Sequence, residues 1–331
     1  MKQIIDKFNE EALEGFLQSI TLSDFSKLPR QHVIMRMPYG NERAYHTVDQ
    51  GRPRLLSGIT SVTKKIAKAK GFPDILGDWK IKVGLDAADE IAHNTSNLGT
   101  FMHIICSELT MVYQKDDPDY FVAFDEFARE LFVKTMQNVG VSPSEIPSYW
   151  KRVVKGAISW NNFLHEYDLD IQAIEFPVVD FDKNIATPLD IIAYAGKDRA
   201  LCNFNIKFRE KANTYETDGL QVCAEQYIFN KYVAPVSGEK IERTYIVIPK
   251  SHPQAKTECL VKDYTGYYSE ASWDEDIDYM MRQDNYKGIF FPDMTKPVTN
   301  VANVTIGRKV TINHPPRLDE FILSYETATI K

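Results

Sequence analysis

Cysteine is scarce in this 331-residue chain and is nowhere clustered. The four cysteines, Cys106, Cys202, Cys223 and Cys259, lie far apart and form no C-x-x-C pair. This spacing argues against a zinc ribbon and against a disulfide framework, so we expect reduced thiols in packed positions. It also offers no cluster of thiolates that could hold iron and sulfur, and we expect no iron-sulfur cluster.

Long apolar runs and an N-terminal secretory signal are absent as well. No segment approaches the roughly 18 uninterrupted apolar residues of a spanning helix. The chain also turns charged at Lys2 and Asp6, too early for a signal peptide. Hydrophobic residues make up 44% and charged residues 26% of the chain, as in ordinary globular proteins. We therefore expect a globular protein without a membrane span, located in the cytoplasm.

The chain has no overall excess of positive charge, which would ordinarily argue against a nucleic-acid partner. Its net charge is −7, whereas neutralising phosphates requires clustered lysine and arginine. The local distribution differs, because residues 52–82 carry eight basic and two acidic side chains, a local net charge of +6. This stretch fits either a solvated helix face or a groove that follows a phosphate backbone. Residues 273–278 are acidic and would repel such a backbone.

The spacing of apolar residues divides the chain into a helical first half and a β-rich second half. Helical periodicity covers residues 1–20, 59–70, 74–93, 97–113, 118–138 and 144–166, with an irregular segment up to about Pro53. β-type runs follow at 171–179, 186–195 and 199–208, then a helix at 217–233 and a strand at 244–249. Helices followed by β-β-β-α-β predict an α/β (mixed α+β) fold, with hairpins between the first strands.

The remaining residues predict a small α+β extension. An acidic helical segment lies near 271–285, and a hairpin at 303–312 turns at Gly307-Arg308-Lys309. We divide the chain into an N-terminal helical and irregular segment (1–56), a core (57–250) and a C-terminal extension (251–331). The extension carries no chemistry that its sequence reveals.

Polar residues alternate with apolar ones along the segment 201–208, as in a strand with one face on a core. Asn205 and Lys207 share the polar face, with Cα atoms about 6.5 to 7 Å apart, so one can hold a metal while the other reaches the same phosphate. Asp190 lies in the preceding strand, which a hairpin can place alongside. On the helix 97–113, His103 belongs to a stripe of small or polar residues that could face Asp190; a hydrogen-bonded interior histidine is the alternative.

In order and spacing, these residues resemble the PD-(D/E)xK nuclease superfamily, and within it the group similar to the RecB nuclease domain and phage exonucleases. The resemblance covers about residues 57–249. It rests on Ser61-Val62-Thr63 leading into Trp79-Lys80-x-x-x-Gly84, on Gly99-Thr100-x-x-His103, on Glu175, on Thr187-Pro188-Leu189-Asp190, on Asn205-Ile206-Lys207 and on Gln221. Each part alone is a weak signal, and the ordered set carries the interpretation.

The resemblance implies a restriction-endonuclease-like core and metal-dependent hydrolysis of DNA, by an exonuclease that acts in recombination, repair or phage replication. In that family a His, an Asp and the acid of D/E-x-K bind Mg²⁺ or Mn²⁺ together with a backbone carbonyl. Carried over, the metal ligands are His103, Asp190, Asn205 and the carbonyl of Ile206. The catalytic residues are Asp190 and Lys207, with Glu175 and Gln221 as supporting or phosphate-side groups.

Three residues depart from the family's pattern. Asn205 replaces a carboxylate, Thr187 stands where glycine is frequent, and Glu108 follows the His motif one position late. An Asn oxygen can still bind Mg²⁺, but it removes a negative charge and should weaken metal affinity. Glu225, one turn after Gln221, either supplies a migrated carboxylate or is an exposed helix charge.

Two other interpretations stay open. The departure at Asn205 and the acidic total favour a catalytically weak or inactive domain of the same fold that binds DNA or a protein. A structural or interaction protein that functions through residues 251–331 is the third interpretation, because fold alone does not define function. No P-loop G-x-x-x-x-G-K-[ST] is present, so translocation would need another protein. The expected partners are DNA and a recombination or replication protein, in the host cytoplasm for a phage protein.

Overall fold

The computed structural model describes the middle of the chain most fully. It describes residues 25–29, 31–32, 34–39, 42–50, 52–73, 81–84, 98–99, 102–103, 105–107, 109–111, 113, 146–209, 212–252 and 254–282. The helices predicted at 1–20 and 118–138, most of the helix at 74–93 and the hairpin at 303–312 lie outside these residues.

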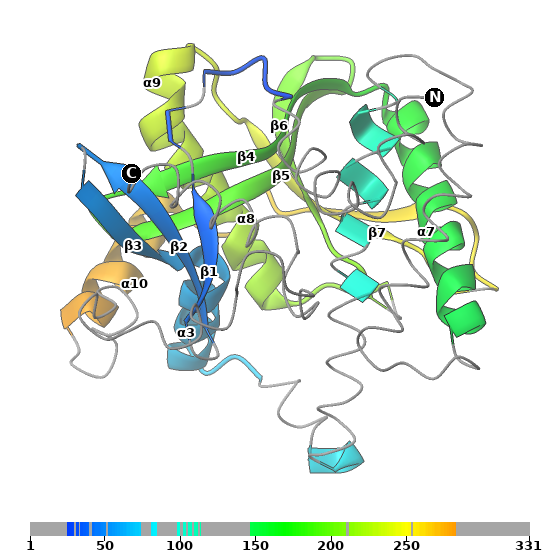
Figure 1. Cartoon of the computed structure of the whole chain (residues 1–331), viewed down its shortest axis with the longest axis horizontal. Helices are drawn as coiled ribbons and strands as arrows, with labels where there is room; N and C mark the ends of the chain where they lie inside the picture. Colours follow the sequence, from blue (N-terminus) through cyan, green and yellow to red (C-terminus); the bar gives the residue numbers. More distant parts are fainter. Residues whose placement is uncertain are drawn as a thin grey trace, which may run out of the picture.

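Eight strands of the described chain form one mixed sheet (Figure 1). They are β1 (Met35–Tyr39), β2 (Glu42–Asp49), β3 (Arg52–Gly58), β4 (Asp170–Asp180), β5 (Ile185–Ala195), β6 (Ala200–Ile206), β7 (Arg243–Pro249) and β8 (Cys259–Asp263). The order is β1-β2-β3-β5-β6-β7-β8, and β4 pairs with β5. The β3–β5 and β6–β7 pairs are parallel and the others antiparallel. The predicted mixed α/β fold is thus confirmed at the level of its class.

The β-β-β-α-β order of the core agrees with its sequence pattern. Strands β4, β5 and β6 form consecutive hairpins, and each lies within two residues of the predicted range. The parallel strand β7 requires a crossover, which α8 (Glu216–Ile228) supplies. This helix continues through a π-helical turn, η1 (Phe229–Val233), and α9 (Ala234–Ser237), where Gly238 ends it at a φ of 77°.

Helices cover both faces of the sheet. On one face, α7 (Ile146–Tyr167) and the helical residues described between 98 and 113 share a hydrophobic cluster with β4 to β7. On the other face, α3 (Ile59–Ala69), α8 and α10 (Glu270–Arg282) share a second cluster with β4, β5 and β6. Alternation along β5 sends Ile191 and Ala193 to the first cluster and Ile192 to the second.

The prediction of an irregular segment before Pro53 is wrong. Part of this segment forms an antiparallel meander of β1, β2 and the start of β3. Proline and charged residues are depleted in strands. Pro38, Arg43 and Pro53 therefore interrupt the alternation of apolar and polar residues that would predict a strand here. Hydrogen-bonded pairing stabilises these residues as strands, because β1 pairs with β2, β2 with β3, and β3 with β5. The edge strand β8, which pairs with β7, was also not predicted.

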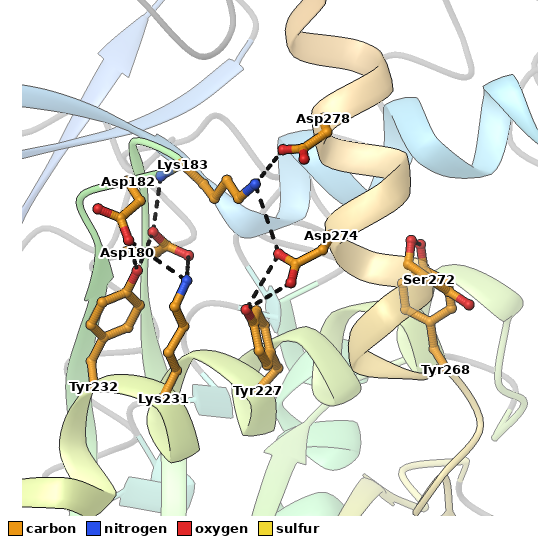
Figure 2. Close-up of polar contacts among 10 residues, drawn as sticks. All are labelled: Asp180, Asp182, Lys183, Tyr227, Lys231, Tyr232, Tyr268, Ser272, Asp274 and Asp278. Carbon is orange, nitrogen blue, oxygen red and sulfur yellow. Dashed lines mark hydrogen bonds and ion pairs between the residues drawn. The ribbon is translucent and has the colours of Figure 1, made fainter.

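Helix α10 is part of the core. Trp273, Ile277 and Met280 are at most 1% exposed and pack in the same cluster as α3 and α8. Figure 2 shows the polar contacts beside them: Tyr227 donates its hydroxyl to Asp274 at 3.2 Å, and Lys183 from the β4–β5 turn contacts Asp274 and Asp278 on α10. Both apolar and ionic contacts therefore attach this helix to the sheet layer.

A second group in Figure 2 attaches η1 to the same turn. Asp180 is fully buried and accepts hydrogen bonds from the hydroxyl of Tyr232 at 2.7 Å and from the backbone N–H of Lys183 at 2.9 Å. Tyr232 also contacts Asp182 at 2.9 Å, and Lys231 lies 3.7 Å from the same carboxylate. These contacts fix the β4–β5 turn, and through it the register of the hairpin.

We expect Trp273→Ala to lower the free energy of unfolding by about 3–5 kcal/mol, because it leaves a large cavity between α10 and α3. Tyr279→Ala on the same helix is the matched control, since Tyr279 is 58% exposed. Denaturant unfolding of both variants measures the difference. Equal stability of the two would show that α10 contributes little to the core.

Among the described residues, the structure contains no helix long and apolar enough to cross a membrane.

Candidate metal centre

The candidate site lies where the sheet forks at β5. One edge of β5 pairs with β4, and the other edge pairs with β3 at residues 185–186 and with β6 at residues 191–195. Among the described strands, residues 187–190 have no ladder partner on that second edge. The side chain of Asp190 fills this position, because its Oδ2 accepts a hydrogen bond from the backbone N–H of Ile206 at 2.6 Å. Asp190 therefore connects β5 to the end of β6.

The alternation of side chains between the two faces of the sheet reverses at Glu175 on β4 and at Asp190 on β5. Ile174 and Ile191 pack in the cluster under α7, whereas Phe176 and Leu189 pack in the opposite cluster. In a regular strand, residues two apart point to the same face. Glu175 has a φ of 49°, a left-handed conformation that is uncommon for residues other than glycine and often marks functional sites.

This reversal places two carboxylates together. Ile174 pairs with Ile191 and Phe176 with Leu189, so Glu175 lies directly opposite Asp190 in the ladder. Asp190 is 7% exposed and Glu175 is half-buried. Two acidic side chains therefore face each other at the fork.

His103 completes a cluster of three possible metal ligands. Its neighbours Met102 and Cys106 are buried in the cluster under α7, which leaves His103 half-buried at the edge of that helix. Its Nδ1 lies 3.7 Å from Oδ2 of Asp190, and one ligand atom each from His103, Glu175 and Asp190 all lie within 4.8 Å of one another. An imidazole nitrogen with two carboxylates suits a divalent cation.

Glu225 lies at the centre of an adjoining hydrogen-bond network. It is fully buried and accepts hydrogen bonds from three carboxamides: Asn203 at 3.0 Å, Asn205 at 3.1 and 3.2 Å, and Gln221 at 2.8 Å. Burial raises the pKa of Glu225 to about 7, and the charge of Asp190 acts in the same direction. The interpretation of Glu225 as an exposed helix charge is therefore wrong.

Asn205 keeps one oxygen that could act as a ligand. Its Oδ1 is buried and accepts no hydrogen bond from any residue that the structure describes. Since buried polar atoms are nearly always paired, this oxygen is suited to a ligand from outside the protein. Asn205 lies one step beyond the last β5–β6 ladder pair, Ile191 with Phe204, and so opposite Asp190. The donor set of this region thus fits a hard divalent cation bound by oxygen and nitrogen.

Lys207 points into the same network. Its ammonium donates a hydrogen bond to Oε1 of Gln221 at 3.0 Å. Burial lowers the pKa of Lys207, and the nearby charges of Asp218, Asp190 and Glu225 oppose that shift. The amide of Gln221 therefore joins Lys207 to Glu225, donating to Glu225 and accepting from Lys207.

The sequence-predicted residues fall into two adjoining groups. One contains His103, Glu175 and Asp190, and the other contains Asn205, Lys207 and Gln221 around Glu225. The hydrogen bond from the Ile206 N–H to Asp190 connects the groups, while the ligand role predicted for the Ile206 carbonyl stays a prediction.

Other parts of the motif set lie elsewhere. Ser61 and Thr63 are buried in the first turns of α3. Thr100, Glu108 and the pair Trp79-Lys80 lie outside the described residues. Sequence reasoning did not single out Asn203, although its polar side chain alternates with apolar neighbours in register with Asn205 and Lys207, and that alternation was the available signal.

No protein-family model and no curated protein matches this chain. The fold and the site define it as a mixed α/β protein that carries a His-Glu-Asp group able to hold a metal at a fork in its sheet. The arrangement of these side chains is therefore the basis for inferring what the protein does.

Proposed function

We propose that this protein is a Mg²⁺- or Mn²⁺-dependent DNA nuclease that hydrolyses phosphodiester bonds as an exonuclease, on a restriction-endonuclease-like core. One observation carries the proposal: the ligand atoms of His103, Glu175 and Asp190 lie within 4.8 Å of one another, beside the Asn205-Ile206-Lys207 segment of the neighbouring strand. A cluster of metal ligands next to a half-buried lysine is the chemistry that phosphoryl transfer to water requires.

His103, Asp190 and Asn205, with Glu175 and the Ile206 carbonyl, would hold the metal. When bound, a divalent ion supplies a Lewis acid for a phosphoryl oxygen and lowers the pKa of a bound water. Asp190 is oriented for this role because the Ile206 N–H fixes its Oδ2. The low exposure of Asp190 and Asn205 strengthens electrostatic interactions at the site, because little water screens them.

Lys207 supplies the positive charge for the phosphate. Its ammonium is held by Oε1 of Gln221, which is itself held by Glu225, so the cation has a fixed position before substrate binds. Positive charge that is fixed in advance stabilises the charge developing on the phosphate without reorganisation during the reaction. Gln221 and Glu225 act as positioning residues in this arrangement.

DNA is the proposed substrate because α3, which shares a hydrophobic cluster with the helix α8 of Gln221 and Glu225, carries exposed basic side chains. Lys64 and Lys68 of α3, and Lys70 directly after it, are exposed within the basic stretch 52–82. Lys70 is paired with Asp276 at 2.9 Å, so Lys68 is a better candidate than Lys70 for a phosphate contact. Such contacts position a nucleic acid without reading its sequence.

Incubation of end-labelled linear and closed circular DNA with Mg²⁺ or Mn²⁺ tests the proposal. We expect metal-dependent loss of the linear DNA, no loss of the circular DNA, and no cleavage in EDTA. Cleavage of circular DNA would support nuclease activity but would contradict the proposal that the enzyme is an exonuclease. Absence of cleavage with either metal would reject both.

A second candidate is a catalytically weak or inactive domain that binds DNA. Asn205 favours it, since an amide in place of a carboxylate lowers the negative charge available to a hard cation. Retention of labelled DNA in a gel-shift assay, together with absence of cleavage in both metals, is the result that this candidate predicts.

A further inference from the structure

Arg152 on α7 has an unpaired edge of its guanidinium group. Its Nε and Nη2 are buried, and neither donates a hydrogen bond to any residue in the described part of the chain. These two nitrogens form the side of the guanidinium that binds a phosphate or carboxylate through two parallel hydrogen bonds. Buried charged donors are almost always paired, so this edge is suited to an anion from outside the protein.

Arg152 lies close to residues that are adjacent in the chain to the candidate site. Its guanidinium carbon is 5.9 Å from the centre of the Phe208 ring, and Phe208 directly follows Lys207. One turn further along α7, a Cβ on Gly156 would lie 2.8 Å from the Phe208 ring and 2.9 Å from Met102, which precedes His103. Residues four apart share a helix face, so Arg152 and Gly156 face the chain neighbours of Lys207 and His103.

The surroundings of Arg152 on α7 are positive. Lys151 precedes it and Lys155 follows three positions later, while the one carboxylate of this helix is Glu166, far along it. No acidic side chain on α7 therefore lies within a turn of Arg152 to neutralise it. An anionic ligand would gain from this charge, and a cationic or neutral one would not.

We propose that Arg152 binds a phosphate group of the nucleic acid, adjacent to the phosphodiester that is hydrolysed. This inference rests on the proposed nuclease function and adds a substrate-binding residue that the motif set did not contain. The phosphate is either an internal phosphodiester or the phosphate at a strand end, since both offer two oxygens to the same guanidinium edge.

Thermal unfolding of the full chain in increasing inorganic phosphate, at constant ionic strength, tests the anion site directly. We expect phosphate to raise the unfolding temperature of the wild type and of Lys151→Met, the exposed neighbour that serves as matched control. Arg152→Met should unfold cooperatively but lose the phosphate-dependent rise, and Arg152→Lys should keep part of it. A wild type insensitive to phosphate, or an equal rise in Arg152→Met, overturns the proposal.

Cleavage kinetics on DNA with and without a terminal phosphate distinguish the two sources. We expect Arg152→Met to raise KM about tenfold, with a smaller change in kcat, because a charged hydrogen-bond pair to the substrate is lost. An effect restricted to the phosphorylated substrate assigns the end phosphate, and an equal effect on both assigns an internal one. Cleavage with unchanged KM overturns the role of Arg152 and leaves the nuclease standing. A phosphate effect that needs Arg152, without any cleavage, overturns the nuclease and leaves the anion site standing.

Discussion

Asp190→Asn is expected to lower metal-dependent DNA cleavage by about a thousandfold, which corresponds to about 4 kcal/mol of transition-state stabilisation. Asp190 contacts the other groups of the site. Its Oδ2 lies 3.7 Å from Nδ1 of His103 and accepts a hydrogen bond from the N–H of Ile206, and the residue lies opposite Glu175. The amide oxygen of an asparagine can still accept that N–H, so the fold should survive. The loss would then reflect the missing charge at the metal.

Single-turnover cleavage and calorimetric titration with Mn²⁺ measure this effect. We expect metal affinity and cleavage rate to fall together, since one carboxylate serves both. Asp263→Asn is the matched control, because Asp263 is exposed on β8 and accepts a hydrogen bond from the backbone N–H of Thr265, as Asp190 does from Ile206. Cleavage by Asp190→Asn at the rate of this control would remove Asp190 from the mechanism.

The second large effect concerns the exchange of a carboxylate between Asn205 and Glu225. Asn205→Asp alone should be damaging, because it replaces the N–H donor that contacts both oxygens of a buried Glu225 with a second acid. Glu225→Gln alone weakens the acceptor shared by Asn203, Asn205 and Gln221. Each single variant should lose about 1–3 kcal/mol of unfolding free energy and most of the cleavage activity.

The double variant Asn205→Asp with Glu225→Gln should recover much of both losses. The glutamine introduced on α8 can donate to the aspartate introduced on β6, which restores the pairing with its polarity reversed. The negative charge then lies at position 205 of β6, where the nuclease superfamily that the sequence resembles has a carboxylate. A double-mutant cycle of unfolding free energy and of cleavage rate measures the coupling. Glu216→Gln on the exposed side of α8 is the control for loss of a helix carboxylate.

The outcome of this cycle also separates the two candidate functions. Recovery in the double variant to the wild-type rate indicates that Glu225 already supplies the charge that position 205 lacks. A rate far above the wild type indicates a decayed site that the exchange has repaired. Losses that simply add, without recovery, would contradict a shared role for the two residues.

Local sequence determined much of the core. The strands β4 to β7 and the helices α3, α7 and α8 follow from apolar periodicity and from the turn residues between them, although β6 and most of α8 are buried on all sides. The meander of β1 to β3 did not follow, since its prolines and charges are tolerated through pairing between strands. The π-helical turn after α8 carries no local signal either, because it continues a regular helical pattern.

For the candidate site, the sequence by itself determined the identity and order of His103, Asp190, Asn205, Lys207 and Gln221. Only the tertiary structure decided that Glu175 faces Asp190, because this depends on a left-handed residue and on both strands changing faces at one step. It also decided that Glu225 is buried against Asn203 and Asn205, since helix α8 and strand β6 meet only through packing across the sheet. Periodicity describes one element at a time, whereas contacts between elements depend on register and twist, which distant residues set.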